Sequence, residues 1–280
     1  MCILDLSPRK IDSRNRRLII GGCATMKIVF VGSGNLATHL CKAVHAVGHD
    51  VLQVYSRTQE AAKVLADIVG TTYTDDIDNI TDNADIYIVA VKDNAVADVT
   101  KRLRRRVGEK LIVHTAGSMS INIIPGENKG VLYPMQTFSK QKDVDFTTIP
   151  CFIESSSSEG LEALKGLAES VSDSVYEMSS RDRMFLHLTA VFCCNFANRC
   201  YSIGAELLKA HGDIPFDVML PLINETAKKL RVLSPHEAQT GPAVRWDTDV
   251  IKKHSELLAD TPLTQQIYDL MSRSIHEDKL

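Results

Sequence analysis

The chain has 280 residues, a formal net charge of −3, 44% hydrophobic residues and 24% charged residues. This composition is typical of a globular protein, and the length allows two domains, each with its own core. No long basic run indicates nucleic-acid binding, and no apolar run approaches the roughly 18 residues that a membrane span needs. We therefore expect a small-molecule substrate and neither a nucleic-acid nor a membrane partner.

The seven cysteines are odd in number and scattered, without C-x-x-C pairs. They predict neither a disulfide framework nor a metal site, and they fit a reducing cytoplasm. We expect Cys193 and Cys194 to act as buried small apolar side chains. Residues 1–25 are polar and Arg-rich, without the apolar core of a secretory signal. We interpret them as a disordered extension or as the product of a misplaced start codon.

The first predicted element is a buried strand, Ile28 to Val31, whose continuous apolar run fits a parallel sheet covered on both faces. It runs directly into G-x-G-x-x-A, the dinucleotide fingerprint, in which the first Gly permits a tight turn and the second lets the backbone approach a pyrophosphate. The helix that follows presents free N–H groups and a positive dipole end to the phosphates. An ordinary tight turn is the weaker alternative. The predicted cofactor-binding residues here are Gly32, Ser33, Gly34, Asn35 and Leu36.

The end of the second strand, Val51 to Tyr55, indicates which dinucleotide binds. An NAD enzyme carries an Asp or Glu about 20 residues past the fingerprint, whereas this chain offers Ser56, Arg57 and Thr58. Arg57 is a fork-shaped cation suited to a 2′-phosphate, to which the two hydroxyls can also donate. NADP(H) is therefore favoured. The alternative is a solvated arginine beside a helix N-cap at Thr58.

Two further strands should end at the cofactor. In a doubly wound sheet, ligands bind outside the carboxyl ends of the strands. The strand Ala84 to Val91 predicts Val91, Lys92 and Asp93 near the adenosine and its ribose, although Lys92 can equally be surface charge. The strand Lys110 to His114 predicts His114, Thr115 and Ala116 near the nicotinamide. His114 is either a proton donor or a positioned neutral group, and we favour the neutral group.

After a strand at Gly130 to Tyr133 and a β segment at Pro150 to Glu154, the α/β pattern ends with the strand Ser174 to Met178. From Arg181 to Leu208 the pattern is that of one long helix. At about 100° per residue, a polar strip padded with small side chains falls on one of its sides. The strip has room for a substrate, which we favour, or for a neighbouring helix. Its polar members are His187, Asn195, Asn198 and Ser202.

The remaining chain is also predicted to be helical. Pro215 to Leu233 reads as an amphipathic helix, and Thr261 with Pro262 begins the last helix. Between them, the segment from Thr240 to Asp247 opens the helix that contains His254. Arg245 can grip a substrate carboxylate bidentately, or it can pair with Asp247 to cap that helix.

Together these residues resemble a known group of Rossmann-like proteins that carry a C-terminal helical domain of unknown function (domain of unknown function 2520). The group is related to pyrroline-5-carboxylate reductase and the 6-phosphogluconate dehydrogenase-like superfamily, and is often labelled an NADP oxidoreductase of the deazaflavin-dependent type. The resemblance runs from Met26 to the C-terminus. It rests on VGSGNLA, HTAGS, LYPMQTF, TGPAVRWD with His254, and the helix that bears His187 and Asn195. Tyr133 stands where many relatives carry His, and Trp246 stands where Gly is commoner.

The predicted fold is α/β: a doubly wound, mostly parallel Rossmann sheet in residues 26–179, followed by an all-α domain in residues 180–280. The predicted protein is an NADP(H)-dependent oxidoreductase that transfers a hydride to or from a small oxo-acid or imine in the interdomain cleft. His187 would be the general acid or base and Asn195 would orient the substrate. The predicted substrate contacts are Gln136, Asn198, Thr240 and Arg245.

Alternatives remain at this stage. Within enzymes, they are a ketopantoate-type reductase and a deazaflavin-dependent NADP reductase. Outside enzymes, a sensor that binds NADP(H) and turns nothing over would need the same fingerprint. The resemblance also implies a homodimer formed through the helical domain.

Overall fold

A computed structural model of the chain describes residues 25–278. The interpretation of residues 1–25 as an extension therefore falls, apart from Thr25, outside the described residues. The chain divides into two compact units, the first ending at Phe192 and the second beginning at Cys193. The domain limits predicted from the sequence, 26–179 and 180–280, stay predictions.

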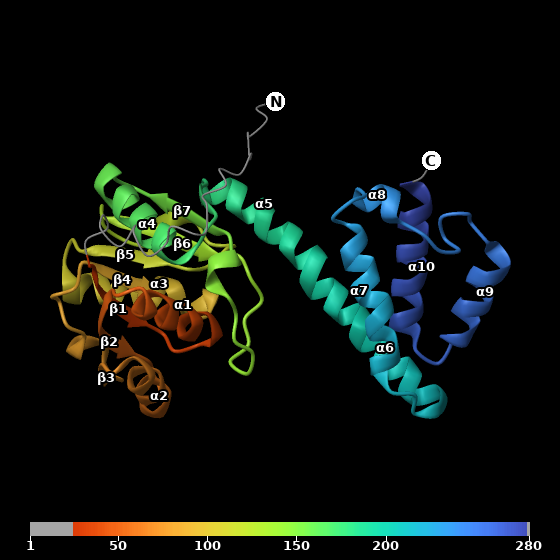
Figure 1. Cartoon of the computed structure of the whole chain (residues 1–280), viewed down its shortest axis with the longest axis horizontal. Coiled ribbons are helices and arrows are strands. Elements are labelled where there is room, and N and C mark those ends of the chain that lie inside the picture. Colours follow the sequence, from red (N-terminus) through yellow and green to blue (C-terminus); the bar gives the residue numbers. More distant parts are fainter. Residues whose placement is uncertain (1–24, 279–280) are drawn as a thin grey trace. The chain divides into compact units, whose positions relative to one another are not determined.

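The first unit is built on an eight-stranded sheet with the order β3-β2-β1-β4-β5-β6-β7-β8 (Figure 1). All neighbouring strands are parallel except β6 and β7. The predicted doubly wound, mostly parallel sheet is therefore confirmed. The strands are β1 (Lys27–Val31), β2 (Asp50–Tyr55), β3 (Thr72–Thr74), β4 (Ile86–Val89), β5 (Leu111–His114), β6 (Lys129–Pro134), β7 (Cys151–Ser155) and β8 (Val175–Glu177).

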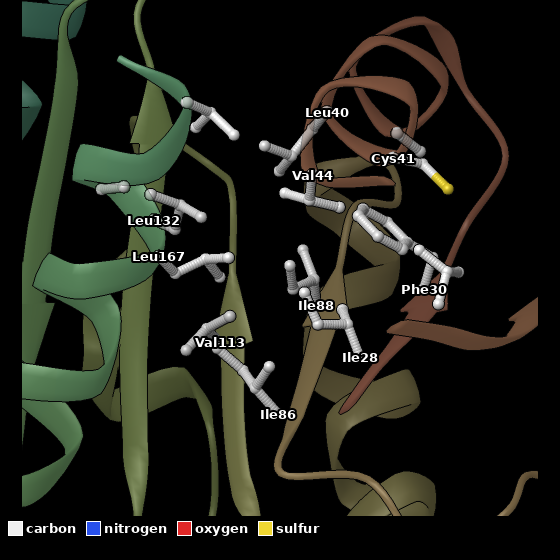
Figure 2. Packing of buried hydrophobic residues seen from close by; sticks show 14 of the residues in the cluster. Ile28, Phe30, Leu40, Cys41, Val44, Ile86, Ile88, Val113, Leu132 and Leu167 are labelled. Carbon is white, nitrogen blue, oxygen red and sulfur yellow. The ribbon is translucent and has the colours of Figure 1, made fainter. Parts of the chain in front are cut away.

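Helices cover both faces of this sheet. Ile28 and Phe30 of β1 pack in one core cluster with side chains of α1, α2 and α4, and Val29 and Val31 pack in a second cluster with side chains of α3. Figure 2 shows the first cluster. The apolar run of β1 is continuous because both faces of the strand are buried. The helices are α1 (Asn35–Ala46), α2 (Gln59–Val69), α3 (Asp93–Val107), α4 (Ser158–Val171) and α5 (Ser180–Ala190), with short 3₁₀ turns at Ile77–Asn79, Ile121–Ile123 and Phe146–Thr148.

A third, smaller cluster lies at the β5 to β8 side of the sheet. Its buried members are Ile121, Val131, Tyr133 and Phe152, and Leu186 of α5 packs against them. The order of strands reverses between β1 and β4, which is the switch point where doubly wound sheets bind ligands.

The described part of the second unit is entirely helical, as predicted, with α6 (Ala197–Gly212), a 3₁₀ turn at Phe216–Met219, α7 (Leu220–Lys229), α8 (Pro235–Ala238), α9 (Thr248–Leu257) and α10 (Pro262–Glu277). The predicted helix Pro215 to Leu233 is wrong at both ends. Pro221 has no N–H to donate, so it is tolerated only in the first turn, and α7 begins at Leu220.

The prediction of one uniform helix from Arg181 to Leu208 is also wrong. A π-helix, Val191–Phe196, lies between α5 and α6. Its i→i+5 hydrogen bonds put more residues into each turn, so the assumed 100° per residue fails there. Cys193 and Cys194 of this segment are exposed, and the prediction that they are buried is wrong.

The second unit buries few apolar side chains of its own. Among its described residues, only Ala243 and Leu258 are buried hydrophobic residues, whereas Leu222, Leu257 and Leu263 are 60%, 81% and 71% exposed. The surface of the second unit therefore carries many large apolar side chains. In residues 25–278, no helix combines the length and apolar character needed to cross a membrane.

Candidate functional site

Three helices of the first unit begin at the carboxyl ends of neighbouring strands. Their N-cap residues are Gly34 for α1, Thr58 for α2 and Lys92 for α3, and none of these makes a side-chain capping hydrogen bond. By contrast, the hydroxyls of Ser157 and Ser179 cap α4 and α5. Except for the N–H of Ala95 in α3, which donates to the carbonyl oxygen of Lys92 at 2.8 Å, the first-turn N–H groups of α1, α2 and α3 are thus left for another acceptor. An anion is the acceptor that helix N-termini favour.

The two glycines of the fingerprint have different roles. Gly32 has φ +123°, and a Cβ there would lie 2.2 Å from the carbonyl oxygen of Ala90, so only glycine fits the turn between β1 and α1. Gly34 has an ordinary φ of −72°. A Cβ at Gly34 would meet nothing within 4 Å. Gly32 therefore shapes the turn, and Gly34 leaves open space in front of α1. Ala37, fully buried, seats the helix on the sheet.

The loop after β6 is fastened to α1. The side chain of Asn35 donates to the carbonyl oxygen of Phe138 at 2.9 Å, and His39 Nε2 lies 2.9 Å from the carbonyl oxygen of Ser139. The Asn35 side chain is therefore already engaged, which leaves its backbone N–H for the predicted cofactor contact. Gln136 accepts from the backbone N–H of Thr137 at 2.8 Å, so in this structure the predicted substrate contact is engaged within its own loop.

The residues after β2 and β4 lie at the same edge of the sheet. Arg57 is exposed and forms no ion pair within the described part of the chain, so its guanidinium is available to a ligand. Thr58 is the N-cap of α2, as the alternative reading of this segment supposed. Lys92 is exposed, and Asp93 accepts from the hydroxyl of Ser118 at 2.5 Å. That bond ties the start of α3 to the loop after β5.

His114, at the end of β5, is fully buried and neutral. The backbone N–H of Ala116 donates to Nδ1 at 3.2 Å, so the ring proton is on Nε2, which lies 3.3 Å from the carbonyl oxygen of Ser120. Burial, assisted by the charge of Arg183, lowers the pKa of His114 to about 4. Of the two roles left open by the sequence, this geometry fits the positioned neutral group.

His187 meets the loop after β5 and the end of β6. Its Nδ1 lies 3.3 Å from the hydroxyl oxygen of Tyr133, and the two rings stand edge to face at 6.2 Å. Both rest on Gly117, where a Cβ would lie 2.7 Å from Tyr133 Cζ and 2.8 Å from His187 Nδ1. The Nε2 atom of His187 makes no hydrogen bond within residues 25–278, so it is the free ring nitrogen.

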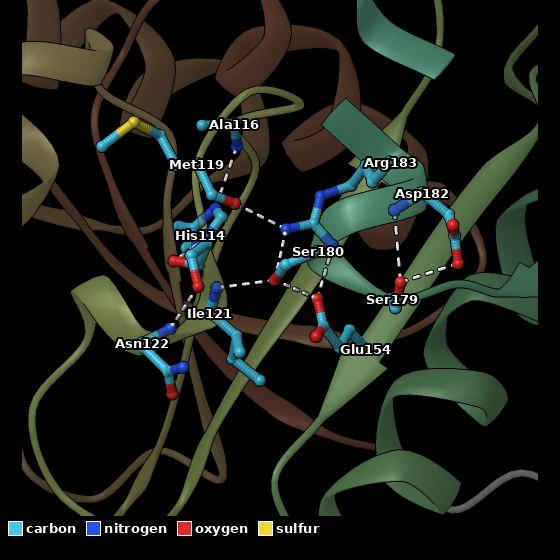
Figure 3. A network of polar contacts seen from close by, with 11 residues as sticks. His114, Ala116, Met119, Ile121, Asn122, Glu154, Ser179, Ser180, Asp182 and Arg183 are labelled. Atoms are coloured by element: carbon cyan, nitrogen blue, oxygen red, sulfur yellow. Dashed lines mark hydrogen bonds and ion pairs between the residues drawn. The ribbon is translucent and has the colours of Figure 1, made fainter. Parts of the chain in front are cut away.

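A buried ion pair holds the helix that carries His187 (Figure 3). Arg183, one turn earlier on α5 and 0% exposed, donates to Glu154 of β7 at 2.6 Å and to the carbonyl oxygen of Met119 at 2.6 Å. Ser180 Oγ also donates to Glu154, and it accepts from the backbone N–H of Ile121. These contacts join the first turn of α5 to β7 and to the loop after β5.

The other predicted residues lie in the second unit. Their side chains are exposed, and their roles stay predictions: Asn195, Asn198, Thr240 and Arg245. Asp247 caps α9 by accepting from the N–H of Val250 at 3.2 Å, and in the described residues it forms no ion pair with Arg245. Trp246 has φ +51°, a conformation that favours glycine, and its ring stacks on His276 with centroids 4.5 Å apart.

The sequence pattern does not predict Arg183 and Glu154 as parts of this site. Arg183 and His187 are four residues apart on a helix, so they share a face. That spacing was readable from the sequence. The partner, Glu154, is a single carboxylate at the end of a strand, which nothing in the sequence connects to a helix 29 residues later.

The chain is similar to known proteins over most of its length. Residues 27–117 match a family described as "NADP oxidoreductase coenzyme F420-dependent", and residues 149–275 match the domain of unknown function DUF2520. The chain is 50% identical to a "putative NADP oxidoreductase" from Bacteroides fragilis, covering 90% of this chain and 98% of that one with a TM-score of 0.85. A comparison with curated proteins found no match.

Two more distant structures share the fold. An imine reductase from Myxococcus stipitatus, in complex with NADP+, is 15% identical with a TM-score of 0.66, over 90% of this chain and 93% of that one. A 1-pyrroline-5-carboxylate reductase from Streptococcus pyogenes is 17% identical with a TM-score of 0.61, over 90% and 99% of the two chains.

Removing the two partners of the buried ion pair should have unequal effects. Arg183 is fully buried, whereas the side chain of Glu154 is 19% exposed. Glu154→Ala leaves a buried charge without its partner and should lower the free energy of unfolding by about 3–5 kcal/mol. Arg183→Met leaves a carboxylate that water reaches, and should cost roughly 1–3 kcal/mol. Urea unfolding of both variants checks this order. Equal losses, or a larger loss for Arg183→Met, would contradict the buried-charge account.

The pKa of His114 predicts a pH-dependent contribution to stability. Because it is lowered from 6.5 to about 4, the folded state resists protonation between those values while the unfolded state accepts the proton. The contribution is complete above pH 6.5 and is lost as the pH falls towards 4, to a total of about 3 kcal/mol. Unfolding of His114→Gln between pH 4 and 7.5 should therefore show a shallower pH dependence than wild type. The exposed His45→Gln serves as the control, and an unchanged slope in His114→Gln would refute the assignment.

Proposed function

Since this chain belongs to the family that joins an F420-dependent NADP oxidoreductase-type domain to the domain of unknown function 2520, we propose that it is an NADP(H)-dependent oxidoreductase acting on a small oxo-acid or imine. The observation that carries the proposal is the set of uncapped helix starts around Gly34, at the switch point of a doubly wound sheet. Three free helix N-termini at one edge suit a ligand with several phosphate groups.

The residues at this edge fit the nucleotide. The pyrophosphate would accept from the first-turn N–H groups of α1, in the open space beside Gly34. The 2′-phosphate would bind Arg57 with the hydroxyls of Ser56 and Thr58, at the uncapped start of α2. When bound, the nicotinamide supplies the hydride chemistry. The matched family name and the NADP+ bound by the imine reductase support the choice of NADP(H) over NAD(H).

The proton would come from the protein. His114 is buried and neutral with both ring nitrogens engaged, so it is unsuited to the task. His187 has one ring nitrogen free, and histidine is the side chain most often used for general acid–base catalysis. We assign His187 the proton transfer and His114 the shaping of the loop after β5. Asn195, Asn198, Thr240 and Arg245 of the second unit are the proposed substrate contacts.

Loss of Arg57 should change cofactor selection. In titration calorimetry with wild-type protein, NADPH should bind more tightly than NADH. Arg57→Ala should weaken NADPH about 10- to 100-fold, as loss of a charged hydrogen bond of about 1.5–3 kcal/mol implies, and should leave NADH nearly unchanged. Arg105→Ala, which removes another exposed arginine of the same unit, is the matched control. Equal weakening of both nucleotides in Arg57→Ala would rule out the 2′-phosphate contact.

Turnover tests the function itself. The purified chain, mixed with NADPH and a panel of small oxo-acids and cyclic imines, should oxidise NADPH in the presence of at least one of them. His187→Ala should then lower kcat about 100-fold or more, the usual worth of a general acid or base, with NADPH affinity kept. NADPH binding without any turnover would favour the sensor, and hydride exchange with a deazaflavin alone would favour the deazaflavin-dependent reductase.

The homodimer stays a prediction, which the mass of the full chain in solution will test.

A further inference from the structure

Tyr133 contacts the proposed proton-transfer residue directly. We propose that Tyr133 is a positioning residue, which holds His187 through Nδ1 and so makes Nε2 the nitrogen that exchanges a proton with the substrate. The part of this proposal that concerns proton transfer rests on the proposed function. The pairing itself rests on the 3.3 Å contact between the Tyr133 hydroxyl and Nδ1.

The tyrosine ring is fixed on several sides. It is 9% exposed, it pairs in register with Phe152 across β6 and β7, and the centroids of these two rings are 6.3 Å apart. Tyr176 stacks on the far side of this group, 5.3 Å from Phe152. Because close-packed side chains have few alternative rotamers, the position of the Tyr133 hydroxyl is set by the sheet.

The histidine ring is fixed from two other directions. Arg183, one turn earlier on α5, joins that helix to Glu154 and to the carbonyl oxygen of Met119. Both rings pack against Gly117, since a Cβ there would lie 2.7 Å from Tyr133 Cζ and 2.8 Å from His187 Nδ1. The pair is thus held at the carboxyl end of β5, the edge where the nicotinamide is expected.

A phenol suits this position because its oxygen can accept from Nδ1–H. With His187 cationic, Nδ1–H donates to the Tyr133 oxygen and Nε2–H faces the substrate. During reduction, the Nε2–H bond breaks and its proton joins the oxygen or nitrogen whose carbon has received the nicotinamide hydride. In the neutral ring that results, the remaining proton stays on Nδ1 and still donates to the Tyr133 oxygen. The ring therefore need not turn between the two protonation states, and Nε2 loses and regains the proton.

Kinetics measure the coupling between the two residues. Tyr133→Phe keeps the ring and removes the hydroxyl, so it should lower kcat about 3- to 10-fold, the range expected for one hydrogen bond, with NADPH affinity unchanged. In a His187→Ala background the same change should have no further effect, because there is no ring left to position. Tyr176→Phe is the matched control. An equal loss from Tyr133→Phe in both backgrounds would overturn the proposal, because it would show a role independent of His187.

A spectroscopic test needs no substrate. In protein labelled with ¹⁵N-histidine, the ring signals of His187 are those that disappear in His187→Gln. In wild type at a pH where the ring is neutral, these signals should report mainly the tautomer with its proton on Nδ1. Tyr133→Phe should move them towards a mixture, and Tyr176→Phe should not. Unchanged signals in Tyr133→Phe would refute the pairing. If the pairing is present but no compound is turned over, the proposed function fails while the Tyr133–His187 contact stands.

Discussion

The ion pair between Arg183 and Glu154 is the contact on which the candidate site depends. It is made by a fully buried guanidinium, whose desolvation is costly unless a partner and further acceptors compensate. Glu154, Ser180 and the carbonyl oxygen of Met119 compensate it, although Arg183 Nε is left without a partner among the described residues. These contacts fix the helix α5 to the sheet one turn before His187. The same charge also helps to keep His114 neutral.

The helices of the first unit differ at their N-termini: some have a side-chain cap and others do not. Where serine hydroxyls cap α4 and α5, the backbone is satisfied by the protein itself, and those ends serve only the fold. At α1, α2 and α3 no side chain makes a capping hydrogen bond, and the helices give up the stability that such a bond supplies, roughly a few tenths of a kcal/mol at Gly34 and up to about 1 kcal/mol at the other two. Local rules of stability are commonly broken where a ligand completes the structure. We therefore propose that the edge at Gly34 binds the nucleotide.

The sequence carried most of the fold because strand periodicity and the glycine turn are local signals. Ile28 to Val31, Gly32 and the strand ending at His114 follow from neighbouring residues alone. The anchor of α5 does not, because a lone Glu154 and a lone Arg183 look like ordinary surface charges until the sheet brings them together. The π-helix at Val191–Phe196 was also beyond reach, since the angular argument assumed a constant turn. Tyr133 stands out in the sequence as an unusual residue, but only the folded chain brings its hydroxyl to His187.

We propose that the nicotinamide lies at the end of β5, beside His187. A crystal structure of the full chain with NADP+ tests it most directly. The account predicts phosphates on the first-turn N–H groups of α1, the 2′-phosphate beside Arg57, and the nicotinamide ring next to His187. A nucleotide bound away from α1, or a nicotinamide remote from His187, would contradict it.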